Sequence, residues 1–138
     1  MYPTILVTLD TTPTDQAILD HIKPLAKRFG SRVVLLHVAT GVPAKFLGPE
    51  AADEEVREDQ AYLNRVHAEL EAAGLLCEAT LAYGEPVKEI VNWVQQNRPD
   101  LVAMGTHGHH FMADLVLGTT AIKVQHSVSV PVLLLRAK

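Results

Sequence analysis

Two glycine-containing segments in the C-terminal third of the chain have the residue types and spacing of a phosphate-binding loop. Residues 105–108 read Gly-Thr-His-Gly and directly follow the apolar run Leu101–Met104. After nine further residues comes Gly-Thr-Thr at 118–120. Glycine lets the backbone approach a ligand closely, and a hydroxyl residue after a glycine can cap a helix whose free N–H groups attract an anion. The pattern therefore predicts a phosphate cradle.

A carboxylate, Asp10, follows the first short apolar run of the chain. In an open α/β sheet, ligands bind beyond the carboxyl ends of the strands, where the connections diverge to opposite faces. If the first and fourth strands are neighbours, Asp10 faces the glycine loop across this crevice and can accept hydrogen bonds from a ribose or a base. A turn or helix-capping carboxylate is the alternative of equal weight.

Histidines form a second candidate cluster at His107, His109 and His110, since neutral imidazoles are common metal ligands. Ligands this close in sequence rarely converge on one ion, and no flanking cysteine supplies a fourth. A phosphate-facing or solvated loop is therefore favoured, and no metal ligand is assigned. His37 lies within an apolar run and is expected to be a hydrogen-bonded core residue rather than a catalyst.

Several other chemistries are disfavoured by the order of the residues. The glycines form no GxGxxG, and none is followed by the Lys-Ser or Lys-Thr of a Walker loop, so a P-loop nucleotide hydrolase is disfavoured. The HxGH motif of nucleotidylyltransferases follows the first strand of its domain, whereas Thr-His-Gly-His at 106–109 follows the fourth. Ser127 and Ser129 lack a GxSxG elbow, so no catalytic residue is assigned.

The composition predicts one globular domain over residues 1–138. Hydrophobic residues make up 48% of the 138 residues, which is ample for a core, and the net charge of −4 with no basic run argues against nucleic-acid binding. The lone Cys77 allows no intramolecular disulfide and fits a reducing compartment. No apolar stretch approaches the ~20 residues that span a bilayer, so we expect a cytoplasmic protein without membrane contact.

Short apolar runs alternate with longer amphipathic ones, which is typical of a parallel sheet covered by helices on both faces. Polar residues interrupt the third run, so we expect a half-exposed edge strand there and more deeply buried strands elsewhere. The five predicted strands are Thr4–Leu9, Arg32–Val38, Leu76–Ala82, Leu101–Met104 and Val130–Arg136.

The first two predicted helices follow the first and second strands. In the first, Thr14 can cap the start and Gly30 can close the end, while Pro24 is expected to interrupt and kink it. The second runs from Asp53 to Ala73, is ended by Gly74, and carries charged outer positions that are most simply a solvated surface. Its predicted inner face comprises Val56, Leu63, Val66 and Leu70.

The third helix is predicted to begin near Pro86, because proline is favoured in a first turn. The last helix is predicted over Thr119–His126, with Ala121, Ile122 and Val124 available for packing. The segment Thr40–Ala52, with two prolines and two glycines, is expected to be a long surface loop or lid.

The spacing Gly105-x-x-Gly108, nine residues, then Gly118-Thr119 resembles the nucleotide-binding signature of the universal stress protein family, G-2x-G-9x-G-[S/T]. The resemblance extends over essentially the whole chain. It includes a first strand ending in Asp10, the segment Val34–Val38, and the closing Pro131–Arg136. Each feature alone is weak, but together they are specific.

This resemblance implies a single doubly wound α/β fold, similar to the adenine nucleotide alpha-hydrolases, with five parallel strands in the order 3-2-1-4-5. It implies that ATP or a related adenine nucleotide, with Mg as an optional companion of the phosphates, is held at the switch point. Asp10 and the backbone of Val38 would meet the adenosine end, and the glycine segments would meet the phosphates. The implied ligand-binding residues are Asp10, Val38, Met104, Gly105, His107, Gly108, His109, Gly118, Thr119 and Thr120.

Two departures from the family pattern bear on the ligand. Thr11-Thr12 stands where the family often has a Gly-Ser pair, and His109 stands where Arg or Lys is frequent. A neutral imidazole supplies less charge to phosphates than a guanidinium, which favours AMP or another small adenine compound over a triphosphate.

The resemblance favours a nucleotide-dependent switch or stress-response module over an efficient enzyme. One alternative is slow ATP hydrolysis or phosphoryl transfer on the same loop, with a divalent ion bridging the phosphates. Another is a structural dimer without a ligand. A homodimer through the last strand is expected in any case, because the apolar run Val130–Leu135 would otherwise leave a hydrophobic sheet edge exposed.

Overall fold

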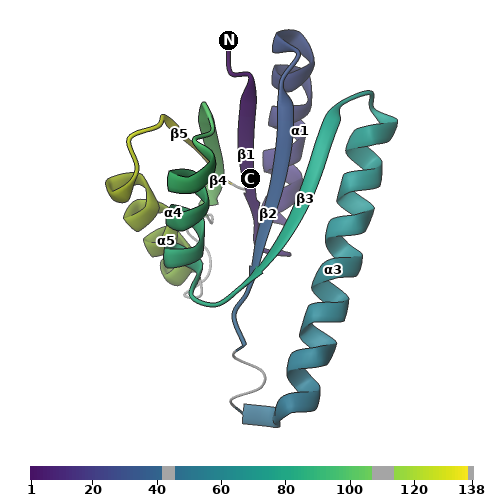
Figure 1. The fold of residues 1–138 in the computed structure, drawn as a ribbon, viewed down its shortest axis with the longest axis vertical. Helices are drawn as coiled ribbons and strands as arrows, with labels where there is room; N and C mark the ends of the chain where they lie inside the picture. Colours follow the sequence, from purple (N-terminus) through teal and green to yellow (C-terminus); the bar gives the residue numbers. More distant parts are fainter. Residues whose placement is uncertain (42–45, 107–113, 137–138) are drawn as a thin grey trace.

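The computed structural model describes residues 1–41, 46–106 and 114–136. Across these ranges the chain forms a parallel sheet with the strand order β3-β2-β1-β4-β5 (Figure 1). This confirms the predicted α/β class and the order 3-2-1-4-5. The strands are β1 (Thr4–Leu9), β2 (Arg32–Ala39), β3 (Leu76–Tyr83), β4 (Leu101–Thr106) and β5 (Val132–Arg136).

Helices cover both faces of the sheet (Figure 1). They are α1 (Thr14–Phe29), α3 (Pro49–Ala72), α4 (Pro86–Asn97) and α5 (Asp114–Ser127). Because successive side chains of a strand point to opposite faces, Ile5 and Val7 of β1 pack with α1 and α3, whereas Leu6 packs with α4 and α5. Both faces of the central strands are therefore apolar. Within the described ranges, no helix has the length and apolar character to cross a membrane.

The two edges of the sheet are more exposed than its centre. β3 is half exposed along its length, as predicted for an edge strand. β5 is also only partly buried, and Leu134 is 36% exposed, so the prediction of a deeply buried last strand is wrong. The reason is its place at the end of the sheet, since β4 is the one described strand that pairs with β5.

The helix α1 ends as predicted, but it begins differently. Gly30 adopts a left-handed conformation at φ 65° and closes the helix. Thr14 is the first helical residue and is buried, while Pro13 occupies the capping position without a side-chain hydrogen bond. The helix continues through Pro24, so the predicted interruption is wrong. Pro24 lies on the exposed side, where a carbonyl deprived of its helical partner can bind water.

The helix α3 begins at Pro49, four residues before the predicted start at Asp53, so the segment before it is shorter than the predicted loop Thr40–Ala52. A proline in the first turn needs no N–H partner, which explains the earlier start. Its C-terminus lies just before Gly74, as predicted, where φ is 88°. The buried inner positions are Leu63, Val66 and Leu70.

The helix α4 begins at Pro86, as predicted. The Glu85 carboxylate caps it by accepting hydrogen bonds from the amides of Val87 at 3.1 Å and Lys88 at 2.9 Å. This cap fixes the connection that follows β3.

The helix α5 begins at Asp114, five residues before the predicted start at Thr119. Of the three predicted packing residues, Ala121 and Val124 are buried, whereas Ile122 is 52% exposed. The prediction for Ile122 is therefore wrong. The apolar type of a single residue does not determine its face when the apolar residues of a helix do not form one stripe.

Candidate functional site

A cavity of about 150 Å³ lies beyond the carboxyl ends of β1, β2 and β4. In the sheet order, β1 and β4 are adjacent, and the helices that follow them, α1 and α5, cover opposite faces. This is the switch point at which ligands bind in open α/β sheets. The described residues that line the cavity are Thr8, Leu9, Asp10, Leu36, His37, Val38, Thr40, Pro86, Ile90, Met104, Gly105 and Thr120.

Half of the residues named from the sequence converge on this cavity. Asp10, Val38, Met104, Gly105 and Thr120 line it, although they come from four different segments of the chain. The structure thus places the end of β1 opposite the end of β4, as the crevice argument required.

The other named residues are not among the described residues that line the cavity. Thr119 is exposed, and Gly118 lies within α5. His107, Gly108 and His109 lie outside the described residues, as does His110. Among the residues that the structure describes, no group of three His, Cys, Asp or Glu side chains is placed to hold a metal ion.

The Gly-Thr pair at 118–119 does not start a helix. Because α5 begins at Asp114, Gly118 lies in its second turn, where backbone N–H groups bond within the helix. The predicted cap by Thr119 is therefore wrong. The free N–H groups of this helix belong to its first turn, so any phosphate that uses them lies N-terminal to Gly118.

Gly105 has a packing reason to be glycine. A Cβ atom built on it would lie 2.5 Å from Thr14 Cγ2 and 3.0 Å from Ile18 Cδ1, both in α1. The missing side chain therefore lets α1 pack closely against β4. Close approach of the backbone to a phosphate, the reason offered from sequence, is not needed to explain this residue.

Asp10 serves as a turn residue at the edge of the cavity. Its Oδ1 accepts a hydrogen bond from the Thr12 amide at 3.0 Å and another from the Thr12 hydroxyl. The turn role, one of the two alternatives, is thus present. Asp10 also lines the cavity, and its contact with a ligand remains a prediction.

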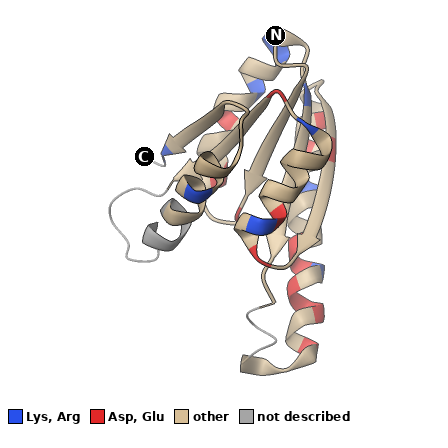
Figure 2. Ribbon diagram, turned by 60° about the vertical axis from the view of Figure 1, so that its left-hand side comes forward, with Lys and Arg blue, Asp and Glu red and all other residues tan. Residues whose placement is uncertain are grey.

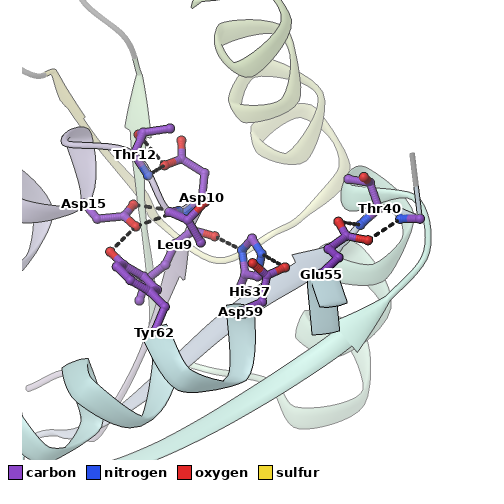
Figure 3. A network of polar contacts seen from close by, with 11 residues as sticks. Leu9, Asp10, Thr12, Asp15, His37, Thr40, Glu55, Asp59 and Tyr62 are labelled. Atoms are coloured by element: carbon purple, nitrogen blue, oxygen red, sulfur yellow. Dashed lines mark hydrogen bonds and ion pairs between the residues drawn. The ribbon is translucent and has the colours of Figure 1, made fainter. Parts of the chain in front are cut away.

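Behind Asp10 lies a second, buried carboxylate, Asp15, which is 1% exposed. It accepts hydrogen bonds from the amides of Asp10 at 3.0 Å and Thr11 at 2.9 Å, and from the Tyr62 hydroxyl at 2.5 Å (Figure 3). Burial and the negative charge of Asp10 raise the pKa of Asp15 to about 7. Burial and the Asp15 hydrogen bond also raise the pKa of Tyr62.

His37 is a hydrogen-bonded core residue, as predicted, and its ring also forms part of the cavity wall. Its Nδ1 lies 2.8 Å from the Leu9 carbonyl oxygen, and its Nε2 lies 2.9 Å from Asp59 Oδ2 (Figure 3). A carbonyl oxygen only accepts, so Nδ1 donates to it. Both ring nitrogens are engaged by the protein, which suits a fixed wall better than a proton-transfer group.

The helix α3 carries three polar side chains that hold the rim of the cavity. Glu55 accepts hydrogen bonds from the amides of Thr40 at 3.2 Å and Gly41 at 3.1 Å. Asp59 binds His37, and Tyr62 binds Asp15 (Figure 3). Figure 2 shows acidic residues along this helix. The sequence interpretation of its charged positions as a solvated surface is therefore wrong for Glu55 and Asp59.

A doubly wound parallel sheet with a cavity at its switch point defines a class of small α/β ligand-binding domains. The model of the universal stress protein family matches residues 1–136. The chain therefore belongs to the universal stress protein family.

Individual relatives agree with this assignment. The chain is 30% identical over 138 residues to a universal stress protein of Thermus aquaticus, and the alignment covers 99% of this chain and 100% of the relative. It is 26% identical over 141 residues to universal stress protein MJ0531 of Methanocaldococcus jannaschii, covering 99% of this chain and 83% of the relative.

Solved structures with the same fold include MJ0577 of Methanocaldococcus jannaschii, with a TM-score of 0.87, 26% identity, and coverage of 100% of this chain and 98% of that chain. A universal stress protein in complex with cAMP has a TM-score of 0.77 at 19% identity, with 99% of each chain covered. One from Archaeoglobus fulgidus in complex with dAMP has a TM-score of 0.71 at 18% identity, with 97% of each chain covered. At these identities the last two show a shared fold.

Proposed function

We propose that the cavity binds the adenosine part of an adenine nucleotide. The observation that carries the proposal is the convergence of Asp10, Val38, Met104, Gly105 and Thr120 on one cavity at the switch point of the sheet. The resemblance to the family implies a ligand contact for each of these residues. Two universal stress proteins of the same fold are in complex with cAMP and dAMP, which supports this ligand class.

The chemistry of the walls suits a purine nucleoside. Leu36, Ile90 and Met104 offer apolar surface to the faces of a base, and Asp10 lies where its carboxylate can accept hydrogen bonds from ribose hydroxyls. Small-molecule sites usually enclose about 300–1,000 Å³. In this proposal the nucleoside lies in the cavity of about 150 Å³, and the phosphates extend beyond it toward the first turn of α5.

In this proposal the chain is a single regulatory domain of the cytoplasm that takes ATP, ADP or AMP, with Mg accompanying the phosphates of the larger ligands. Nucleotide binding orders the surface around the phosphates and so changes what a partner protein meets. The function is then that of a nucleotide-dependent stress-response switch.

Calorimetric titration of the wild-type protein with AMP, ADP and ATP tests the proposal. Asp10→Asn should weaken binding about tenfold, because it removes a charge-assisted hydrogen bond to the ribose. Asp20→Asn is the matched control, since Asp20 is an exposed carboxylate on α1 whose partner is Gln16. Absence of binding to all three nucleotides, or equal affinities of the two variants, would contradict the proposal.

A further inference from the structure

The turn that carries Asp10 has an unfavourable backbone conformation. Thr11, the next residue, has a φ of 64°, in the left-handed region that L-residues with a branched Cβ rarely adopt. Its side chain is exposed, so packing does not compensate for this conformation. Such a conformation persists only where surrounding contacts determine it.

Asp15 supplies those contacts from the first turn of α1. One of its carboxylate oxygens accepts from the Asp10 amide and the other from the Thr11 amide, so a single side chain fixes two consecutive peptide groups. The carboxylate is itself buried and is held from the opposite side by the Tyr62 hydroxyl of α3 (Figure 3). Three donor groups, two from the turn and one from α3, therefore meet at one carboxylate of α1.

We infer that Asp15 is a positioning residue for nucleotide binding, because its buried carboxylate, oriented by Tyr62, holds the strained turn that directs Asp10 toward the cavity. The inference rests on the proposed function, since it assigns to Asp10 the ribose contact proposed above. It adds two residues, Asp15 and Tyr62, that do not line the cavity. They act through the backbone at Asp10 and Thr11.

The first test compares AMP affinity in wild-type protein, Asp15→Asn and the control Asp20→Asn, each measured on folded protein. An asparagine side chain can accept from only one of the two amides, so Asp15→Asn should weaken AMP binding about tenfold, the effect of losing one hydrogen bond. Asp20→Asn should bind like wild type. An unchanged affinity for AMP in Asp15→Asn overturns the inference.

The second test is rescue by glycine. Thr11→Gly removes the conformational cost of the left-handed backbone without removing a packed side chain. It should leave AMP affinity close to wild type on its own and should restore most of the affinity lost in Asp15→Asn. If the double variant binds AMP as weakly as Asp15→Asn alone, Asp15 does not act through the turn, and the inference is overturned.

A milder variant covers the case in which Asp15→Asn does not fold. Tyr62→Phe keeps the ring, which packs at the margin of the core, and removes only the hydroxyl that holds Asp15. It should weaken AMP binding about threefold, whereas Tyr2→Phe, at the opposite end of β1, should have no effect. Equal affinities of the two variants for AMP count against the inference.

If wild-type protein binds no nucleotide, the proposed function fails, and the turn is then tested by urea unfolding alone. Residues 11 and 15 should be coupled, so that Asp15→Asn shifts the unfolding midpoint less in the Thr11→Gly background than in wild type. Additive shifts show that Asp15 does not hold the turn, and they overturn the inference.

Discussion

Replacement of Asp15 by asparagine should change how the stability of this protein depends on pH. The pKa of Asp15 is raised from 3.8 to about 7 in the folded protein by burial and by the charge of Asp10. The folded state therefore binds the proton more tightly than the unfolded state. This contribution to stability is fully present below pH 3.8 and is lost as pH rises through about 7.

The magnitude follows from the two pKa values. They differ by about three, and each pKa unit corresponds to about 1.4 kcal/mol, so the free energy of unfolding should fall by at most about 4 kcal/mol between pH ~4 and ~8 because of Asp15. Asparagine does not titrate. The difference in unfolding free energy between wild type and Asp15→Asn should therefore shrink, or change sign, over that interval.

Urea unfolding at a series of pH values measures this difference, with Asp20→Asn as the control for loss of an exposed carboxylate. The outcome decides between opposing effects. Three hydrogen bonds donated to Asp15 favour its ionised form, whereas burial and Asp10 favour the protonated form. A difference that stays constant, or that grows as pH rises, would show that the donated hydrogen bonds prevail and would refute the reasoning.

Three further changes test other parts of the molecule. Gly105→Ala should lower the free energy of unfolding in urea by about 1–3 kcal/mol, because the added methyl meets Thr14 Cγ2 at 2.5 Å. Thr14→Ser should recover part of this loss. An unchanged free energy of unfolding in Gly105→Ala would contradict the packing argument. Wild-type protein should be a homodimer in light scattering at about tens of micromolar, and Leu134→Lys on the edge strand β5 should make it a monomer. A monomeric wild type would contradict the predicted dimer. ATP affinity measured by calorimetry should rise as pH falls from about 8 to about 6, because an unperturbed imidazole of pKa ~6.5 gains charge in this range. His109→Arg should flatten this pH dependence. An unaltered pH dependence in the variant would show that His109 does not contact the phosphates.

The sheet could be predicted from sequence because each strand is a short apolar run between amphipathic segments. β1 has the predicted bounds, and the other strands differ from prediction by at most two residues at either end. Glycines and prolines with clear backbone consequences also marked helix ends, as Gly30, Gly74 and Pro86 show. The strand order came from the family resemblance, since periodicity does not specify which strands are adjacent.

Features that depend on tertiary surroundings were not predictable in the same way. The apolar and polar residues of α5 do not separate onto two faces of the helix, so neither its start nor the exposed face of Ile122 could be derived from periodicity. Gly105 lines the cavity, but its need for glycine comes from α1, a contact that no local pattern reveals. Asp15 lies on the buried side of α1, and a lone acidic residue there looks like ordinary first-turn electrostatics.

One stripe of α3 is polar near the binding site and apolar further along the helix, so its inward-facing polar residues were not recognised from sequence. Glu55, Asp59 and Tyr62 fall at the i, i+4 and i+7 positions, and the same stripe continues into Val66 and Leu70. The C-terminal half meets the apolar face of the sheet, whereas the N-terminal half projects past the strand ends, where backbone amides and the His37 ring need partners (Figure 1). The polar residues continue the inner face rather than oppose it. Acidic residues that continue an apolar helical stripe therefore indicate a helix that extends beyond the carboxyl ends of the strands, where the cavity lies.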